Sequence, residues 1–179
     1  MSDASDNRPV RVAWVCGPHT LARWGRTLQP AAIGLMDELV EVTALCPSDA
    51  DTCELPSPPV ELLTHGPWRR LGMATQELRR VGEQLRARKI DVVHVLDASL
   101  TGSLRRPARE ADARLVLTCD GLDEADELRH HVPRGAHVLA ASTPIQQRLL
   151  ERHVATSDRT HLLRPGTIQV KHARCFREV

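Results

Sequence analysis

Short apolar runs alternate with longer amphipathic stretches along this chain, and this alternation defines its predicted elements. The clearest runs occupy residues 91–97, 114–121 and 137–143, and each passes from apolar to small and polar residues before a helical pattern begins. Runs that are apolar on both faces are typical of strands buried in a parallel sheet. We therefore expect the three runs to end at one shared edge of the sheet.

The same pattern predicts seven strands separated by helices. The strands are expected at residues 11–16, 40–46, 60–64, 90–96, 115–118, 137–141 and 161–163. The clearest helix covers residues 67–89, where apolar residues recur at alternating steps of three and four. Strands that alternate with helices imply right-handed crossovers, so the predicted fold class is α/β: a doubly wound, mostly parallel, Rossmann-like sheet of about seven strands in a single domain.

Prolines and capping residues help to place the other helices. Pro30 suits a first helical turn, and Thr143 followed by Pro144 provides a cap and a first-turn proline. Pro107 is expected to disturb the helix that contains it. These remaining helices are predicted at residues 30–39, 101–111, 123–128 and 143–150.

Length and composition favour one domain with its own core. The chain has 179 residues, of which 41% are hydrophobic, and this suits a single domain slightly above the commonest size. We expect a disordered polar tail at residues 1–9, the Rossmann-like domain at residues 10–167, and a tail or the start of an interdomain linker at residues 168–179.

Charge, aromatic content and cysteine usage exclude several classes of partner. A net charge of +1 and an aromatic content of 2% argue against nucleic acid, which requires a basic surface and often stacking rings. The five cysteines form no C-x-x-C pair, and a reducing cytoplasmic compartment suits them. No apolar run approaches the roughly 18 residues that indicate a membrane span.

Polar and small residues follow the predicted strands at the edge where ligands bind in open parallel sheets. They are Gly17, Pro18 and His19 after the first strand, Asp97, Ala98 and Ser99 after the fourth, Asp120 and Gly121 after the fifth, and Ser142 and Thr143 after the sixth. The first turn lacks G-x-G-x-x-G, and Pro18 has no N–H for a pyrophosphate, which disfavours a nicotinamide or flavin site. P-loop, H-E-x-x-H and G-x-S-x-G motifs are also absent from the sequence.

Each candidate residue also has a structural interpretation. Asp97 and Asp120 are candidates for binding a sugar hydroxyl or acting as a base, or they cap the elements that follow them. His94 either lines the cleft or is a satisfied histidine inside its strand, and His19 either contacts a ligand or belongs to an exposed loop. Cys119 is a buried thiol or a nucleophile beside Asp120.

Four motifs together resemble the N-terminal half of a GT-B glycosyltransferase, in the large retaining family that uses nucleotide sugars. In chain order they are DVVHV at 91–95, LTCD at 117–120, VLAAST at 138–143 and LRPGT at 163–167. The sequence differs from the family at two points. Cys119 replaces a histidine before the aspartate, and Gly17-Pro18-His19 stands where paired glycines are common.

The resemblance implies that this chain is the acceptor-binding half of an enzyme that transfers a sugar from a nucleotide-sugar donor to a sugar or glycan acceptor. The donor would bind mainly to a C-terminal domain that is missing here, without which the chain is expected to be inactive. No metal or other cofactor is expected, because the missing half would meet the charge of the leaving diphosphate. The substrate-binding residues would be Gly17, His19, His94, Asp97, Ser99, Asp120, Gly121 and Ser142, with Asp97 and Asp120 as candidate catalytic groups.

Two other functions are compatible with the same residues. A non-enzymatic regulatory or scaffold module would use the polar residues at the sheet edge only to cap helices. A small hydrolase or reductase would use Cys119 and requires an activated thiol. Whether this chain is itself an enzyme is therefore left open by the sequence.

Overall fold

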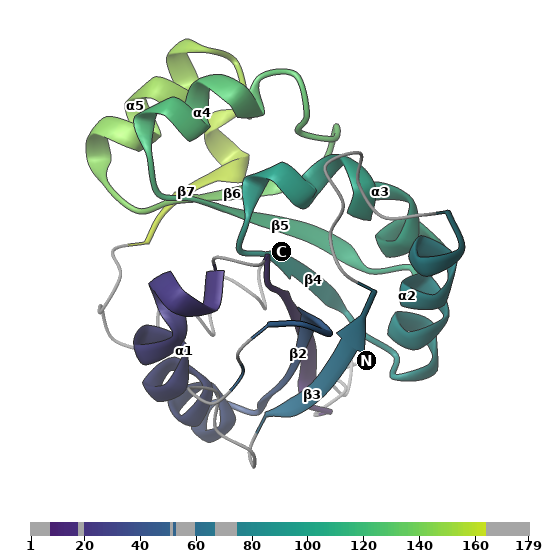
Figure 1. Cartoon of the computed structure of the whole chain (residues 1–179). Coiled ribbons are helices and arrows are strands. Elements are labelled where there is room, and N and C mark those ends of the chain that lie inside the picture. The colour runs from purple at the N-terminus through teal and green to yellow at the C-terminus, as the bar shows by residue number, and fades with distance from the viewer. Residues whose placement is uncertain (1–7, 18–19, 51, 53–59, 67–74, 164–179) are drawn as a thin grey trace, which may run out of the picture.

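The computed structural model is built around one parallel sheet of seven strands in the order β3-β2-β1-β4-β5-β6-β7 (Figure 1). It describes residues 8–17, 20–50, 52, 60–66 and 75–163. The strands are β1 (Val10–Val15), β2 (Val40–Pro47), β3 (Glu61–His65), β4 (Val92–Val95), β5 (Arg114–Cys119), β6 (His137–Ala140) and β7 (Thr160–Leu162). All six neighbouring pairs are parallel.

The predicted fold class is confirmed, and each predicted strand is found within about two residues of its expected bounds. The helices are α1 (Thr20–Asp37), α2 (Thr75–Ala87), α3 (Thr101–Glu110), α4 (Leu122–Leu128) and α5 (Thr143–Glu151), with two 3₁₀ turns, η1 (Ala98–Leu100) and η2 (Ser157–Arg159). The predicted tails at 1–9 and 168–179 lie almost entirely outside the described residues, as does the first part of the helix predicted at 67–89.

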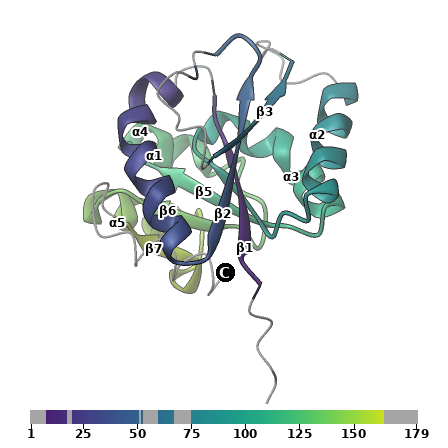
Figure 2. The ribbon, with the colours of Figure 1, turned by 90° about the horizontal axis from the view of Figure 1, so that it is seen from below.

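Helices cover both faces of the sheet. Figures 1 and 2 show α1 on one side of β1 and β2, and α2 with α3 on the other side. Two apolar clusters reflect this arrangement. One joins alternate strand residues to Leu28, Ala32 and Leu35 of α1, and the other joins the opposite strand residues to α2, α3, α4 and α5. Strands whose successive side chains all meet a helix layer must be apolar throughout, which explains the continuous runs in the sequence.

The strand order reverses between β1 and β4. From β1 the chain proceeds to β2 and β3 on one side, whereas β4, β5, β6 and β7 follow on the other side. β4 is the fourth of the seven strands and thus the central one. The carboxyl ends of β1 and β4 therefore flank the switch point at which ligands bind in this fold class.

The prediction that Pro30 begins a helix was wrong. α1 begins at Thr20 and continues through Pro30 to Asp37. A proline inside a helix removes one backbone hydrogen bond and costs about 3 kcal/mol. Here the helix buries Leu21, Leu28 and Leu35 against the sheet, and complete burial of such side chains contributes about 1.5–3 kcal/mol each. Tertiary packing thus outweighs the local cost.

The helix predicted at residues 101–111 is found as α3, which contains Pro107 and continues to Glu110. The predicted cap of α5 needs correction. At α5, the N-cap is Ser142, with Thr143 as the first helical residue, and Ser142 makes no side-chain capping bond. Pro144 lies in the first turn, where its missing N–H has no intrahelical role.

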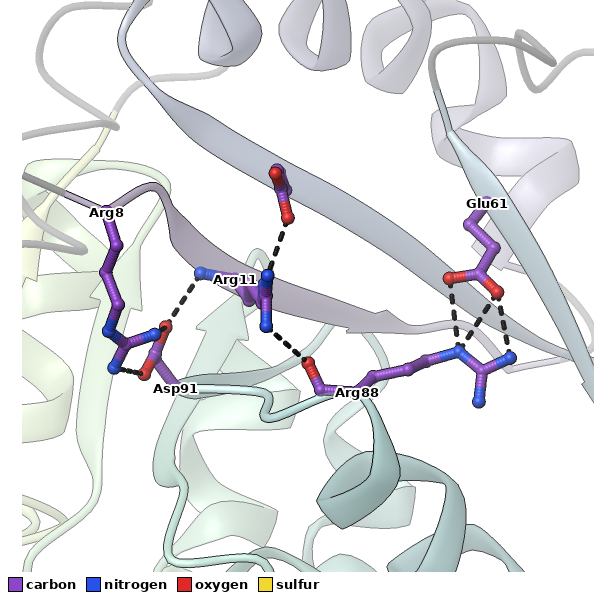
Figure 3. A network of polar contacts seen from close by, with 6 residues as sticks. Arg8, Arg11, Glu61, Arg88 and Asp91 are labelled. Carbon is purple, nitrogen blue, oxygen red and sulfur yellow. Dashed lines mark hydrogen bonds and ion pairs between the residues drawn. The ribbon is translucent and has the colours of Figure 1, made fainter.

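Charged side chains connect four strands at the amino-terminal edge of the sheet (Figure 3). Asp91 accepts hydrogen bonds from both Arg8 terminal nitrogens, at 3.1 and 2.6 Å, and from the Arg11 backbone N–H at 2.9 Å. Arg11 bonds Glu41 at 3.0 Å, and Arg88 bonds Glu61 through two nitrogens. The aspartate that opens the DVVHV motif is therefore at the edge opposite the switch point, where its hydrogen bonds join the starts of β1 and β4.

Four helices are followed by a non-glycine residue whose backbone adopts the left-handed conformation. Leu39, Lys89, Asp112 and His153 have φ between 52° and 58°, and each lies two residues after the end of its helix. After α2, the Ile90 N–H reaches back to the Leu85 carbonyl at 3.1 Å, a pattern that normally has glycine at the left-handed position. Side chains at these positions carry a conformational cost.

Lys89→Gly should therefore stabilise the protein. Lys89 is exposed, so the change removes the left-handed cost of about 1–2 kcal/mol, and the entropy of a glycine in the unfolded chain offsets roughly 0.5–1 kcal/mol of this gain. We expect urea unfolding to show a free energy about 0.5–1 kcal/mol higher. Lys89→Ala is the control, since alanine keeps the strained conformation; equal stability of the two variants would contradict the explanation.

A hydrogen bond joins two histidines, one on β6 and the other on the edge strand β7. Nδ1 of His137 lies 3.0 Å from Nε2 of His161, and the rings stack at 5.3 Å. A hydrogen bond between two imidazoles requires that one nitrogen be unprotonated. Burial lowers the pKa of His137, followed by the charges of His161, Arg159 and Arg114, with Asp158 opposing them. The folded state therefore favours the neutral form of His137.

This pair predicts a loss of stability in mild acid. Because the folded-state pKa of His137 is below its unfolded value of about 6.5, its contribution is intact above that pH and falls as the pH drops below it, where the unfolded chain binds more protons. Urea unfolding between about pH 7.5 and 5 should show a smaller pH dependence for His137→Gln than for the wild type. His130→Gln, an exposed site after α4, is the control; an equal reduction there would argue against the pair.

Candidate functional site

Asp97 follows β4 at the switch point and is locked by two contacts. Its Oδ1 accepts hydrogen bonds from the Ser99 N–H at 3.1 Å and from the Ser99 hydroxyl at 2.6 Å, which makes Asp97 the N-cap of η1. Its Oδ2 points at Gly17, where a Cβ would lie only 2.0 Å away. The capping interpretation of Asp97 is therefore correct, and one carboxylate oxygen remains at the mouth of β1.

Gly17 begins the connection from β1 to α1. Its N–H donates to the Thr20 hydroxyl at 2.8 Å, while the Thr20 N–H donates to the Gly17 carbonyl at 3.1 Å. Thr20 is buried, so this reciprocal pair fixes the first turn of α1 against the sheet. His19, which was predicted to be a site residue, and Pro18 lie outside the described residues.

Asp120 follows β5 and forms an ion pair with α1. Its Oδ1 lies 3.1 Å from a terminal nitrogen of Arg23, and 10% of the Asp120 side chain is exposed against 64% of the Arg23 side chain. The Arg23 guanidinium also lies 5.7 Å from the centre of the Trp24 ring. Asp120 does not cap α4, whose N-cap is Gly121. The structure thus places a largely buried carboxylate beside an accessible cation.

Glu124, in the first turn of α4, connects the ends of β4 and β5. Its two carboxylate oxygens accept hydrogen bonds from the Asp120 N–H at 2.8 Å and, more weakly, from the Ala98 N–H at 3.4 Å. Burial raises the pKa of Glu124, and the charge of Asp120 adds to this, while the backbone donors oppose it. The sequence analysis missed this residue, although a glutamate at the third position of a helix is a known capping signal.

Cys119 is a buried thiol rather than an activated one. Burial, with the charge of Glu124 next, raises its pKa to about 12, and its Sγ donates to the Gly121 carbonyl at 3.5 Å. Since the thiolate is the nucleophilic form, such a cysteine reacts slowly near neutral pH. The hydrolase or reductase hypothesis based on Cys119 therefore loses its chemical basis.

The other predicted residues lie at different depths. His94 is buried inside β4, and its Nε2 lies 2.7 Å from the Thr118 hydroxyl on β5; this favours the structural interpretation. Ser99 is exposed beside Asp97, Gly121 is the N-cap of α4, and Ser142 is the N-cap of α5.

The candidate site is thus a set of carboxylates at the carboxyl edge of β1, β4 and β5. Gly17 and Asp97 meet directly, and Glu124 joins Asp120 to the residue after Asp97. Arg23, Thr20 and Glu124 were not predicted; α1 starts ten residues earlier than expected, so the sequence offered no signal for the first two. Within the described residues, no three His, Cys, Asp or Glu side chains are grouped as a metal site requires. The edge is suited to accepting hydrogen bonds from hydroxyl groups.

Comparison with known proteins identifies the family. Residues 25–166 match the model of the glycosyl transferase 4-like domain, so this chain belongs to that family. A search of curated protein sequences gives no match. Across the residues that the structure describes, no helix combines the length and the apolar character that a membrane crossing demands.

Solved structures with low sequence identity share the fold. A glycosyltransferase from Rickettsia africae matches with a TM-score of 0.68 at 13% identity, covering 95% of this chain and 49% of that one. HepE from Anabaena, solved with UDP and glucose, matches with a TM-score of 0.63 at 14% sequence identity, covering 88% of this chain and 44% of that one. Sucrose-phosphate synthase from Thermosynechococcus elongatus matches with a TM-score of 0.60 at 14% sequence identity, covering 94% of this chain and 98% of that one.

These matches confirm the resemblance that the four motifs indicated. The fold is that of the N-terminal domain of a GT-B glycosyltransferase, and the chain is a partial glycosyltransferase domain. It spans about half the length of the first two structures named above. The order of weak motifs along the chain was therefore a better guide than any one of them.

The Gly17–Asp97 contact predicts the effect of a single methyl group. Gly17→Ala should displace the Asp97 side chain and weaken its cap on η1, lowering the unfolding free energy by about 1–3 kcal/mol, as overpacking usually does. Gly102→Ala in α3 is the matched control, because nothing lies within 4 Å of its added Cβ, and it should leave stability unchanged or raise it by up to about 1 kcal/mol. Equal effects in urea unfolding would contradict the close approach.

Proposed function

We propose that this chain is the acceptor-binding half of a glycosyltransferase and that a second domain supplies the nucleotide-sugar site. The observation that carries the proposal is the set of carboxylates at the switch point of a domain that belongs to the glycosyl transferase 4-like family. Coverage of about half of the length of the Rickettsia africae glycosyltransferase and of HepE supports the need for a second domain. HepE was solved with UDP and with UDP-glucose, so a uridine diphosphate sugar is the donor class to test first.

Asp120 is the residue we assign to the acceptor. Its carboxylate is largely buried and lies beside Arg23, so a hydroxyl group of the acceptor would find a strong hydrogen-bond acceptor with a cation nearby. Asp97 has one oxygen occupied by its cap and the other against Gly17, which suits a residue that shapes the cleft. Gly17, Ser99, Gly121 and Ser142 would line the same edge, His94 would lie beneath it, and His19 would complete it from the connection after β1.

No metal or cofactor enters this assignment, because the diphosphate charge would be met by the second domain. We also assign the reaction to the cytoplasm, since the three cysteines of the described residues, Cys16, Cys46 and Cys119, are free thiols and free thiols suit a reducing compartment.

The division between two domains can be tested by ligand titration. UDP-glucose and UDP are titrated into this chain alone and into the full-length protein by calorimetry. The chain alone should bind at least about a hundredfold more weakly, because most donor contacts would be missing, and it should not transfer glucose. A complete, active nucleotide-sugar site in this chain alone would contradict the division.

The role of Asp120 can be tested with a conservative variant. A panel of mono- and disaccharides is screened against the chain by NMR to find an acceptor, and Asp120→Asn should then weaken its binding about 10- to 100-fold, as expected for losing a charged hydrogen bond worth about 1.5–3 kcal/mol. Asp123→Asn, an exposed carboxylate in the same turn, is the control. Lost stability with unchanged binding would favour the alternative, a scaffold or regulatory module.

A further inference from the structure

A pair of cysteines lies at the carboxyl ends of two neighbouring strands, next to the candidate site. Cys16 follows β1, and Cys46 is the penultimate residue of β2. Both are free thiols, and both are buried, with 0% and 1% of their surface exposed. Neither the family match nor the proposed function assigns them a role.

The strand register brings these two residues side by side. β1 and β2 are parallel with Val15 opposite Leu45, and the Cys16 N–H continues the ladder to the Leu45 carbonyl at 3.0 Å. Cys16 is therefore aligned with Cys46, and both pack in the same apolar cluster on the α1 face. Neighbouring strands are about 4.8 Å apart, which lies within the Cα–Cα separation of about 4.4–6.8 Å that disulfides span.

A hydrogen bond also joins the two thiols. A hydrogen bond between them lowers the pKa of Cys46 and raises that of Cys16, and burial together with the Asp97 carboxylate further disfavours a Cys16 thiolate. The arrangement therefore distinguishes the two sulfurs: Cys46 is the thiol that ionises first, and Cys16 is the proton donor that stabilises it.

We infer that Cys16 and Cys46 form an oxidisable dithiol, which a small disulfide compound converts to an intramolecular disulfide joining β1 to β2. In the first step, the Cys46 thiolate attacks one sulfur of the oxidant and releases the other as a thiolate. Cys16 then gives its proton to solvent and attacks the Cys46 sulfur, releasing the second thiol. The protein loses two electrons and two protons, and the oxidant becomes two thiols.

The position of the pair gives this modification a consequence for the candidate site. Cys16 directly precedes Gly17, whose backbone approaches the Asp97 carboxylate. A covalent bond from Cys16 to Cys46 would restrict the backbone that leads into this contact and into the first turn of α1. We expect oxidation to shift the amide resonances of Gly17 and Thr20, whereas those of β6, on the far side of the sheet, should remain in place.

The test uses the full chain with 2-hydroxyethyl disulfide as the oxidant, because a small uncharged probe can reach buried thiols during local opening. The chain is incubated at about pH 8, where a thiolate of lowered pKa is populated, and remaining thiols are alkylated after denaturation. Trypsin with Asp-N then separates Cys16, Cys46 and Cys53 onto different peptides, residues 12–23, 37–48 and 51–69. Mass spectrometry should find the first two peptides cross-linked and two hydrogen atoms lighter, with the link reversed by dithiothreitol.

Internal and variant controls separate this chemistry from general oxidation. Cys119 is equally buried but has a pKa of about 12, and it should stay reduced. In Cys16→Ser, Cys46 should retain the mixed disulfide with the probe, because the resolving thiol is gone. The inference is wrong if wild-type Cys16 and Cys46 are both recovered as alkylated thiols, carry only separate mixed disulfides, or cross-link to Cys53 instead. None of these outcomes depends on sugar binding, so the result is independent of the proposed function.

Discussion

The candidate site depends on the close approach of β1 and β4 at their carboxyl ends. A carboxylate oxygen of Asp97 occupies the space that any side chain at residue 17 would need, so a larger residue there would displace this carboxylate. The same carboxylate caps η1 through Ser99, and Gly17 fixes the start of α1 through Thr20. Backbone approach, helix placement and carboxylate orientation therefore depend on the contacts of two neighbouring residues, Gly17 and Asp97.

The two opposite edges of the sheet carry different kinds of polar side-chain contact. At the amino-terminal edge, Asp91, Arg11 and Arg88 take part in ion pairs and backbone hydrogen bonds between neighbouring strands. Each exposed pair contributes only about 0.2–1 kcal/mol, but together they hold the strand starts in register. At the carboxyl edge, Asp97, Asp120 and Glu124 are concentrated in one region, where burial, with the charge of Asp120 adding to it, raises the pKa of Glu124. The ion pairs at the amino-terminal edge thus stabilise a sheet that carries a cluster of carboxylates at its carboxyl edge.

Packing also explains where local rules fail. α1 contains a proline in its interior and still forms, because its apolar face is buried against β1 and β2. His94 interrupts an apolar strand but is accommodated through Thr118 on the next strand. Cys119 stands where the family often has a histidine, and burial keeps it protonated. In each case the sheet and its helix layers determine the outcome, whereas the residue type alone suggests another.

The pattern of apolar and polar residues was enough to predict the fold class, the seven strands and the family resemblance, because strands buried on both faces must be apolar and turns after them must be small or polar. It also located Gly17, Asp97 and Asp120 at strand ends. The contact of Asp97 with Gly17, the ion pair of Asp120 with Arg23, and the binding of Glu124 to the amides of both neighbouring loops became visible only in the folded chain. Three of these contacts join residues 26 to 97 positions apart, and periodicity carries no information about such distances. The fourth, between Glu124 and the Asp120 N–H, is local but depends on where α4 begins.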